Sequence, residues 1–404
     1  MTDKMQVNLR QVAMEILYEV QKNNGLLHVV LSDALKKYQY LDKNERSFIS
    51  RLVQGTEERK IELDYIIDSF SKTPVKKQKD VIRIILEMSV YQLKYMDSVP
   101  ASAVCNEAVK LAVKKNFGTL RGFVNGVLRN IARNIDNIEY PDKSTNTDKY
   151  LSVKYSVPEE LAGYFLKKFG DNETEEMFEA FNKDKSTYIR CNTKKTDIAG
   201  LTAALEAEGV TVTNEGIDKR IDYALKISGY DYLGGLKSFR DGLFFVQDIS
   251  SMLASQGGFI KRDAYVIDVC AAPGGKSINA ALMADIGHVS SRDISGRKVS
   301  LIKENAERLG IDNITYKVWD AVKKDEESVE KADVLICDLP CSGLGIIGRK
   351  PDIKYNVTYE KIKELALLQR KILSTVWEYV KKDGILIYST CTVTPEENAE
   401  NTEW

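Results

Sequence analysis

Residues 265–277, YVIDVCAAPGGKS, decide how the C-terminal part of this chain folds. Val266 and Ile267 form a short apolar run that ends at Asp268, and small residues and turn formers then lead into a helical pattern at Lys276. This order predicts a strand, a tight loop and the start of a helix. Glycines let the backbone approach a ligand closely, and the first helical turn exposes N–H groups that favour a negative or polar group. An ordinary turn without a ligand is the alternative for this stretch alone.

From Val246 onward, strand patterns alternate with helical patterns. The expected strands read YVID, HVSSRD, ITYKVWD, ADVLICD and GILIYST, and the expected helices include GRKVSLIKENAERLG. Strands that alternate with helices of about 10–15 residues specify a parallel, doubly wound α/β sheet, in which ligands bind beyond the carboxyl ends of the strands. Polar or reactive side chains follow five of these ends, namely Asp268, Asp293, Asp320, Asp338 and Cys391.

Composition indicates a globular protein of several domains. The chain has 404 residues, and single cores stop growing at about 250–300 residues. No apolar run of about 18 residues occurs and the first residues lack the core of a signal peptide, so we expect a cytoplasmic protein without membrane contact. The six cysteines form no CxxC pair, which predicts reduced thiols without a disulfide or a metal.

Residues 1–135 combine a helical pattern with an excess of positive charge. Apolar residues recur at helical spacing, for example at Val12, Ile16, Leu17 and Val20, and polar breaks such as KNNG separate the helices, which predicts an all-α bundle. The region holds 22 Lys and Arg against 15 Asp and Glu. This surplus favours a polyanion partner, although a solvated basic surface would give the same count.

Two shorter regions separate the bundle from the sheet. Residues 136–185 are acidic, with a linker at Pro141 and a typical helix start at Pro158, so we expect a linker with connecting helices that does not contact RNA. Residues 186–244 contain the strand pattern STYIRCNT, the helical pattern DIAGLTAALEAEGV and the strand pattern TVT. These predict a small α+β module of the βαβ type, similar to an RRM. Residues 245–404 form the sheet domain.

Two cysteines stand where the ends of adjoining strands are expected to meet. The segment Asp338–Tyr355, DLPCSGLGIIGRKPDIKY, follows a buried strand, and a prolyl-cysteine at a strand end exposes the thiol of Cys341 for nucleophilic or acid–base duty. Cys391 in YSTCTVTPEEN ends the next strand. Burial is the usual fate of a cysteine, but a pair at neighbouring strand ends beside Asp338 favours chemistry.

The acids and glycines match known nucleotide-binding motifs only in part. Asp293 lies 25 residues after Asp268, close to where a Rossmann-type sheet places an acid that binds a ribose diol; a helix cap is the alternative. The sequence GGKS imitates the end of a P-loop, yet the first glycine of that motif is replaced by Cys270, and no G-x-G-x-x-G occurs. An NTPase would therefore be a distorted case.

Three segments resemble the RNA 5-methylcytosine methyltransferases that use S-adenosylmethionine. DVCAAPGGK (268–276), DLPCS (338–342) and STC (389–391) look like motifs one, four and six of that family. Residues 101–133, ASAVCNEAVKLAVKKNFGTLRGFVNGVLRNIAR, look like the closing helices of a NusB-like RNA-binding bundle, although their small residues would also serve simple helix packing. The architecture is thus similar to the RsmB (Sun) branch, which modifies small-subunit (16S) ribosomal RNA.

The resemblance implies roles for residues of the sheet domain. Cys391 is the implied nucleophile that adds to cytosine C6, Cys341 the thiol that helps to release the product, and Asp338 the acid that bridges cofactor and target base. Asp293 and Asp320 are implied to bind the ribose hydroxyls and the adenine amino group. Lys276 is implied to be both catalytic and cofactor-binding. The implied cofactor loop, which would line the methionine and ribose part of the cofactor, consists of Cys270, Ala271, Ala272, Pro273, Gly274, Gly275, Lys276.

Four further residues are expected to contact RNA. Arg190 and Asn192 resemble the R-x-N element that precedes the catalytic domain in these enzymes, with surface groups on an edge strand as the alternative. Arg349 and Lys350, together with Lys276, are expected to hold phosphates, unless they are ordinary solvated charges.

The expected partner is therefore small-subunit ribosomal RNA, and the protein is expected to be a monomer. A non-catalytic RNA-binding ribosome assembly factor is the alternative. The chain stops at Trp404, before the further helix and antiparallel hairpin that methyltransferase sheets of this class contain, so we expect a truncated C-terminus.

Overall fold

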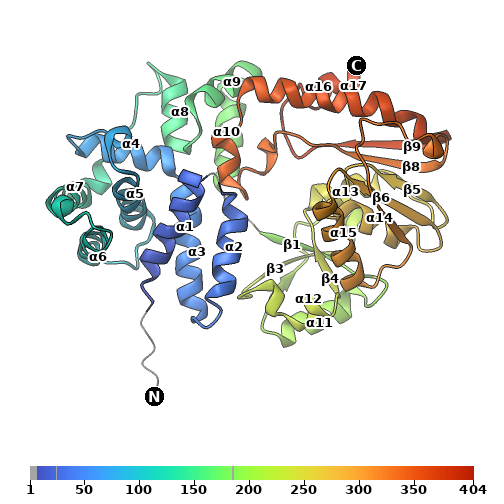
Figure 1. Ribbon diagram of the computed structural model, residues 1–404, viewed down its shortest axis with the longest axis horizontal. Coiled ribbons are helices and arrows are strands. Elements are labelled where there is room, and N and C mark those ends of the chain that lie inside the picture. The colour runs from blue at the N-terminus through green and yellow to red at the C-terminus, as the bar shows by residue number, and fades with distance from the viewer. Residues whose placement is uncertain (1–6, 24, 184–185) are drawn as a thin grey trace. The chain divides into compact units, whose positions relative to one another are not determined.

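The computed structural model describes residues 7–23, 25–183 and 186–404. The chain forms two compact units that are not continuous in sequence. The first, which we call the helical unit, comprises Met1–Lys183 and Ile346–Tyr359, and the second, the sheet unit, comprises Asp184–Gly345 and Glu360–Trp404 (Figure 1). The segment 346–359 lies within the stretch expected to form the sheet domain, but it folds with the helices.

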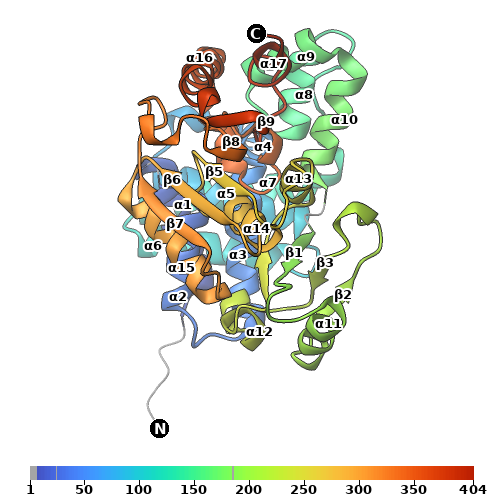
Figure 2. The same ribbon diagram turned by 90° about the vertical axis from the view of Figure 1, so that its right-hand side faces the viewer.

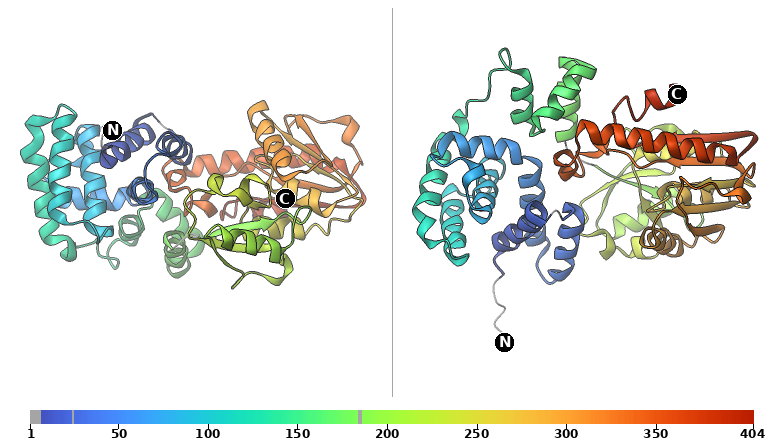
Figure 3. Two further views of the ribbon diagram at one scale, coloured as in Figure 1. Left: turned by 90° about the horizontal axis from the view of Figure 1, so that it is seen from below. Right: turned by 45° about the horizontal axis from the view of Figure 1, so that its top comes forward.

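The helical unit confirms the expected all-α bundle. Its helices are α1 (Leu9–Asn23), α2 (Leu27–Lys37), α3 (Lys43–Glu58), α4 (Lys60–Phe70), α5 (Asp80–Tyr95), α6 (Ala101–Lys114), α7 (Arg121–Asn134), α8 (Thr147–Tyr155), α9 (Glu159–Phe169), α10 (Asp171–Asn182) (Figures 1 and 3). The α1 residues that recur at helical spacing are all buried, and α5 contributes the fully buried Ile84, Ile85 and Leu86. Apolar stripes on α1 to α7 thus close one common core.

The segment 346–359 is anchored to the helical unit through its 3₁₀ turn, η8 (Pro351–Tyr355). The Tyr355 hydroxyl donates to the carbonyl oxygen of Glu57 at 2.8 Å, and the Lys354 ammonium donates to that of Glu58 at 2.7 Å. These carbonyls belong to the last turn of α3, where no further helical N–H is available to them. The segment therefore caps α3.

Residues 186–246 form a small antiparallel sheet. Its strands are β1 (Thr187–Cys191), β2 (Thr211–Thr213), β3 (Ala224–Ser228) and β4 (Phe244–Val246), in the order β2-β3-β1-β4. Helix α11 (Ile198–Ala207) connects β1 to β2, and β3 lies between them, antiparallel to both. This is a split β-α-β arrangement, in which the two strands joined by the helix run parallel without touching.

The second sheet is parallel and doubly wound, as the alternating pattern predicts. Its order is β7-β6-β5-β8-β9, with β5 (Tyr265–Asp268), β6 (His288–Asp293), β7 (Ile314–Val318), β8 (Ala332–Asp338), β9 (Val380–Ser389) (Figure 2). Helices α14 (Gly275–Met283) and α15 (Gly296–Leu309) pack on the face that carries Val266, and α16 (Tyr359–Val376) packs on the face that carries Ile267. The remaining α-helices of the described part of the sheet unit are α12 (Lys237–Arg240), α13 (Ile249–Gln256) and α17 (Ala399–Glu403).

Strand β6 is buried although it is polar. Arg292 donates to Asp325 at 3.0 Å and to the Ser328 hydroxyl at 2.7 Å, and Lys317 also donates to Asp325 at 2.8 Å. A buried charge is tolerated when it is paired and hydrogen-bonded. The loop after β7 supplies those partners and allows HVSSRD to lie inside the sheet. Among the described residues, no helix combines the length and apolarity needed to cross a membrane.

Candidate active site

The loop between β5 and α14 has the geometry that its glycines predict. Gly274 adopts a φ of +106°, and its N–H donates to the Ala271 carbonyl at 2.7 Å. A Cβ at this position would lie 3.1 Å from Ile278 and 3.2 Å from Ile302, so both the backbone angle and the space call for glycine. The loop is also tied to β6, because the Ala272 N–H donates to Asp293 at 3.1 Å.

Asp268 at the end of β5 is fully buried beneath this loop. Its Oδ2 accepts from the Ser277 hydroxyl at 2.6 Å, while its Oδ1 has no hydrogen-bond partner among the described residues. Burial raises the pKa of Asp268 to about 7, and the neighbouring charge of Asp338 acts in the same direction. A carboxyl group with spare acceptor capacity thus lies at the centre of the sheet edge.

Asp338 joins the cofactor loop to the last strand. Its Oδ2 lies 2.8 Å from the Lys276 ammonium, and its Oδ1 accepts from the Ser389 hydroxyl at 2.7 Å. Asp338 and Ser389 are direct partners in the pairing of β8 with β9, which explains their proximity. The Lys276 side chain is only 12% exposed, so its charge is directed at Asp338.

The structure brings the two predicted thiols together. The sulfur atoms of Cys341 and Cys391 are 3.1 Å apart, and the Cys391 N–H lies 3.2 Å from the Cys341 sulfur. Neither cysteine is part of a disulfide. The hydrogen bond with Cys391 raises the pKa of the Cys341 thiol, and burial raises it further. Cys391 is exposed, so it is the more accessible of the two sulfurs.

Sequence reasoning missed the polar group that lies behind these thiols. Ser342, the residue after Cys341, donates from its backbone N–H to the buried carboxylate of Glu397 at 2.8 Å. Glu397 follows β9 in the segment TPEEN. A charged residue in a loop gives no sequence signal of burial, since most such residues are solvated.

The expectation that Arg190 and Asn192 contact RNA is wrong, because both are 1% exposed. The Arg190 guanidinium donates to Gln247 at 2.6 Å and to the Gly275 carbonyl at 2.8 Å, and burial lowers its pKa to about 9. The Asn192 amide donates to the carbonyls of Gly242 and Leu309 at 2.8 and 2.7 Å. The pair therefore attaches the small sheet to the start of α14 and the end of α15.

The remaining predicted residues have separate locations. Asp320 is half-buried just beyond β7, and its carboxylate accepts from the Val322 N–H at 3.2 Å. Arg349 and Lys350 belong to the segment that folds with the helical unit, and Arg349 is exposed. Their contact with phosphate stays a prediction, as does that of Lys276.

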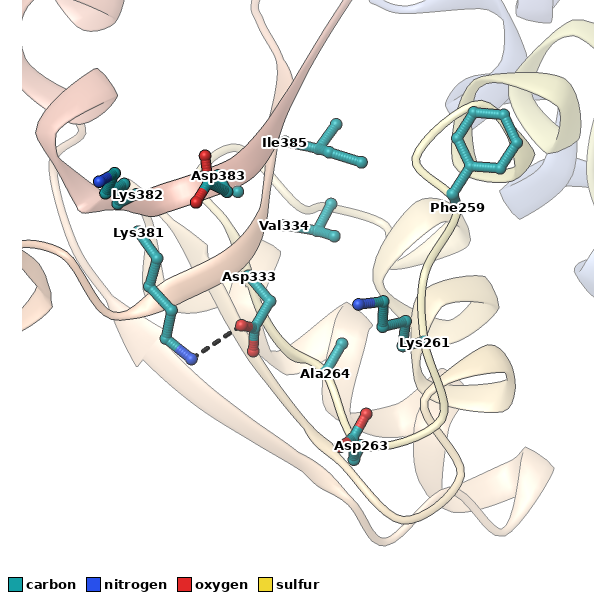
Figure 4. A pocket seen from close by; sticks show the side chains of 11 residues that line it. Phe259, Lys261, Asp263, Ala264, Asp333, Val334, Lys381, Lys382, Asp383 and Ile385 are labelled. Carbon is teal, nitrogen blue, oxygen red and sulfur yellow. Dashed lines mark hydrogen bonds and ion pairs between the residues drawn. The ribbon is translucent and has the colours of Figure 1, made fainter.

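A pocket of about 440 Å³ lies at the opposite end of the sheet (Figure 4). It is lined by residues of the segment 259–264, which precedes β5, and by the first parts of β8 and β9; Lys381 pairs with Asp333 at 2.8 Å on one wall of the pocket. Ligands of open parallel sheets bind at the carboxyl ends of the strands. The pocket therefore does not belong to the site of the thiols.

The fold and the site define a class: a parallel sheet with a glycine loop after its central strand and acids at its carboxyl ends is a Rossmann-like methyltransferase domain. Comparison with known proteins agrees. Residues 260–403 match the family 16S rRNA methyltransferase RsmB/F, and residues 7–133 match the NusB family. A Bacillus subtilis (strain 168) protein named probable ribosomal RNA small subunit methyltransferase B is 36% identical, over 97% of this chain and 87% of its own. The chain belongs to the ribosomal RNA small subunit methyltransferase B family.

Other relatives agree over nearly the full length. A protein of the same name from Synechocystis sp. is 33% identical, over 98% of this chain and 88% of its own. The solved structure of PH0851 is similar with a TM-score of 0.80 and 26% identity, and the match covers 100% of this chain and 90% of that one. A methyltransferase homolog protein from Pyrococcus horikoshii has a TM-score of 0.56 at 26% identity, with 65% and 82% covered. The resemblances to NusB and to the RsmB branch are confirmed.

S-adenosylmethionine is the methyl donor of such methyltransferases, and the residues present fit it. The donor carries a positive sulfonium, an amino acid group and a ribose diol. Carboxylates at the ends of β5, β6 and β8 suit cations and hydroxyls, and Asp268 has an unused buried oxygen. Asp293 already accepts from two backbone N–H groups and lies 3.2 Å from Lys298, so a diol would take the place of that exposed lysine.

Proposed function

We propose that this chain transfers a methyl group from S-adenosylmethionine to C5 of a cytosine in small-subunit ribosomal RNA. The observation that carries the proposal is the 3.1 Å separation of the Cys341 and Cys391 sulfur atoms at the ends of two paired strands, beside Asp338. A methyltransferase acting on an oxygen or nitrogen atom has no need of two converging thiols, because those atoms carry lone pairs of their own.

The two thiols serve to activate the target carbon of cytosine. Cytosine C5 is too weak a nucleophile to take a methyl group directly, so a thiolate must first add to C6 and make C5 enamine-like. Cys391 is the proposed nucleophile because it is the exposed member of the pair. The raised pKa of Cys341 keeps that thiol protonated, and its S–H can stabilise a thiolate at Cys391.

Asp338 is the proposed partner of the base during the addition. Electrons displaced from the C5–C6 double bond build charge toward N3, and Asp338, once it has taken up a proton, donates a hydrogen bond or that proton to N3. Lys276 and Ser389 bind the two carboxyl oxygens and so orient the group. S-adenosylmethionine, when bound, supplies an electrophilic methyl group to C5. Transfer of the C5 proton to solvent, with Cys341 assisting, then restores the double bond and expels the Cys391 thiolate.

The helical unit is the proposed docking site for the RNA. Its first 135 residues carry the surplus of positive charge noted above, and such a surplus supplies sequence-independent attraction for phosphates. Cytosines within a stem would need to be splayed out of the stack before the thiol can reach C6.

The test uses 16S ribosomal RNA and methyl-labelled donor, with nucleoside analysis of the product. We expect label at cytosine C5, none with Cys391→Ala, and a stable covalent RNA adduct with Cys341→Ala, since that variant forms the adduct but releases it slowly. Label on any other atom, or no label from a protein that binds the donor, would refute the proposal. Unchanged biological activity of Cys391→Ala would instead indicate a non-catalytic assembly factor.

A further inference from the structure

A single buried carboxylate lies behind the two thiols and receives every hydrogen bond that it can accept. Glu397 is 0% exposed. Its Oε1 accepts from the Ser342 N–H at 2.8 Å and from the Gln369 amide at 3.1 Å, and its Oε2 accepts from the hydroxyls of Ser342 at 2.5 Å and Thr394 at 2.8 Å. A carboxylate has about four lone-pair positions, so these four donors saturate it.

These donors flank both cysteines along the chain. Ser342 directly follows Cys341, and Pro340 directly precedes Cys341. The Gln369 amide, besides its bond to Glu397, donates to the Pro340 carbonyl at 2.9 Å. The Ser342 hydroxyl lies 2.7 Å from that of Thr392, the residue after Cys391. Glu397 thus holds the chain on both sides of one thiol and, through Ser342, on one side of the other.

Elements α16, α17 and β9 hold Glu397 and Gln369 in place. The fully buried Gln369 comes from α16, and its amide oxygen accepts from Asn401 of α17 at 2.7 Å. The Tyr388 hydroxyl, from β9, lies 2.6 Å from the Glu397 backbone carbonyl. Because each partner is held by a different element, the carboxylate cannot shift without breaking several hydrogen bonds at once.

We propose that Glu397 is a positioning residue for the methyl transfer, which sets the separation of the Cys341 and Cys391 sulfur atoms through Ser342 and Thr392. The inference rests on the proposed function for the reaction that it serves. The residue is not catalytic, since its carboxylate bonds to groups beside the thiols and leaves the reacting atoms to Cys391 and Asp338.

A carboxylate suits this position better than an amide of the same shape. Two of its donors, the Ser342 N–H and the Gln369 amide N–H, have no acceptor on the same atom, so they require an oxygen. The two hydroxyls can rotate and accept instead. Glu397→Gln should therefore keep part of the network and fold, while the Ser342 and Thr394 hydroxyls lose their shared acceptor. The loops that carry the thiols are then held less firmly.

The experiment compares Glu397→Gln with Glu403→Gln, which removes an exposed acid from α17. Donor binding by calorimetry should stay within about twofold in both, because the cofactor loop is untouched. We expect kcat to fall about 10- to 100-fold in Glu397→Gln at unchanged KM for the donor, as for a misplaced reacting group. The alkylation of Cys391 by iodoacetamide, followed against pH, should shift to higher pH, because the Cys341 thiol no longer supports its thiolate.

If Glu397→Gln only lowered the stability of the fold, the pH dependence of Cys391 alkylation would stay the same as in the wild type. The link through Ser342 is tested by combining Ser342→Ala with Glu397→Gln: if Glu397 acts through Ser342, the double variant is no slower than the slower single variant. Multiplicative losses would overturn the inference, and so would wild-type kcat and alkylation in Glu397→Gln.

A second variant keeps the test decisive if Glu397→Gln fails to fold. Thr392→Val is nearly isosteric and removes one hydroxyl from the network, so kcat should fall about 3- to 10-fold with the same shift in alkylation. No change in either quantity would count against the inference. If the wild-type protein does not label cytosine C5, the proposed function fails, while the alkylation measurements still judge the role of Glu397.

Discussion

Replacing Asp268 by asparagine is expected to change how the stability of the sheet unit depends on pH. The Asp268 carboxyl is fully buried and accepts one hydroxyl bond, from Ser277. Burial is the main reason that its pKa rises to about 7, and the charge of Asp338 adds to this, while the Ser277 hydrogen bond and the Lys276 charge oppose it.

The sign and size of the effect follow from proton linkage. An unfolded aspartate ionises near pH 3.9. Between about pH 4 and pH 7 the folded protein holds one proton more than the unfolded chain, so the free energy of unfolding falls as the pH rises through that window and levels off above it. A difference of about three pH units corresponds to about 4 kcal/mol, as an upper bound. An asparagine side chain cannot ionise, so the Asp268→Asn variant should lack this loss.

Tryptophan fluorescence isolates the unit to be measured, because Trp319, Trp377 and Trp404, the three tryptophans of the chain, all belong to the sheet unit. Urea unfolding from pH 4.5 to 8.5 should show the variant gaining up to about 4 kcal/mol relative to the wild type as the pH rises. Asp263→Asn, which removes an exposed acid, should run parallel to the wild type. A gap between wild type and Asp268→Asn that stays constant across pH would refute the reasoning.

Three further predictions concern the loop and its supports. Gly274→Ala should cost about 1–3 kcal/mol of donor binding measured by calorimetry, because alanine at a φ of +106° is strained and crowds Ile278; unchanged affinity would contradict this. Arg190→Lys should lower the stability of the sheet unit by about 2 kcal/mol in the fluorescence assay, since lysine cannot reach both acceptors. The variant should leave the salt dependence of RNA binding unchanged. If the slope of log affinity against log salt concentration were smaller by about one, Arg190 would contact an RNA phosphate after all. Lys276→Met should reduce kcat at least about tenfold with the RNA still bound, because the Asp338 carboxyl loses one of the two partners that orient it; a loss of RNA affinity alone would favour the phosphate contact.

The parts that the sequence predicts well are those with local signals. The run YVID followed by AAPGG fixes β5, its loop and the start of α14 within a dozen residues, because strand periodicity and glycine requirements act over that range. The parallel direction of the strands follows from the alternation with helices. The meeting of Cys341 and Cys391 follows in turn, since both lie just beyond the carboxyl ends of adjoining strands.

What the sequence could not predict depends on partners far along the chain. The strand pattern of apolar and polar residues along β1 predicts that one face is buried. It does not predict that α14 and α15 supply hydrogen-bond acceptors that bury Arg190 and Asn192 on the other face. Arg292 becomes a buried cation only because Asp325 lies in the loop after β7. In each case a polar residue that would ordinarily be solvated is paired inside the protein, and no periodicity reports the pairing.

The positions of the two thiols depend both on the sheet and on individual side chains far along the chain. The pairing of Asp338 with Ser389 fixes two backbones at the strand spacing of about 4.8 Å. Beyond that pair the ladder ends, and Cys341 and Cys391 lie three and two residues into loops that the sheet no longer restrains. A sulfur separation of 3.1 Å therefore needs contacts of its own, and Ser342, Thr392 and Glu397 are placed to supply them. The sheet brings the reacting groups to one edge, and a buried carboxylate sets their final distance.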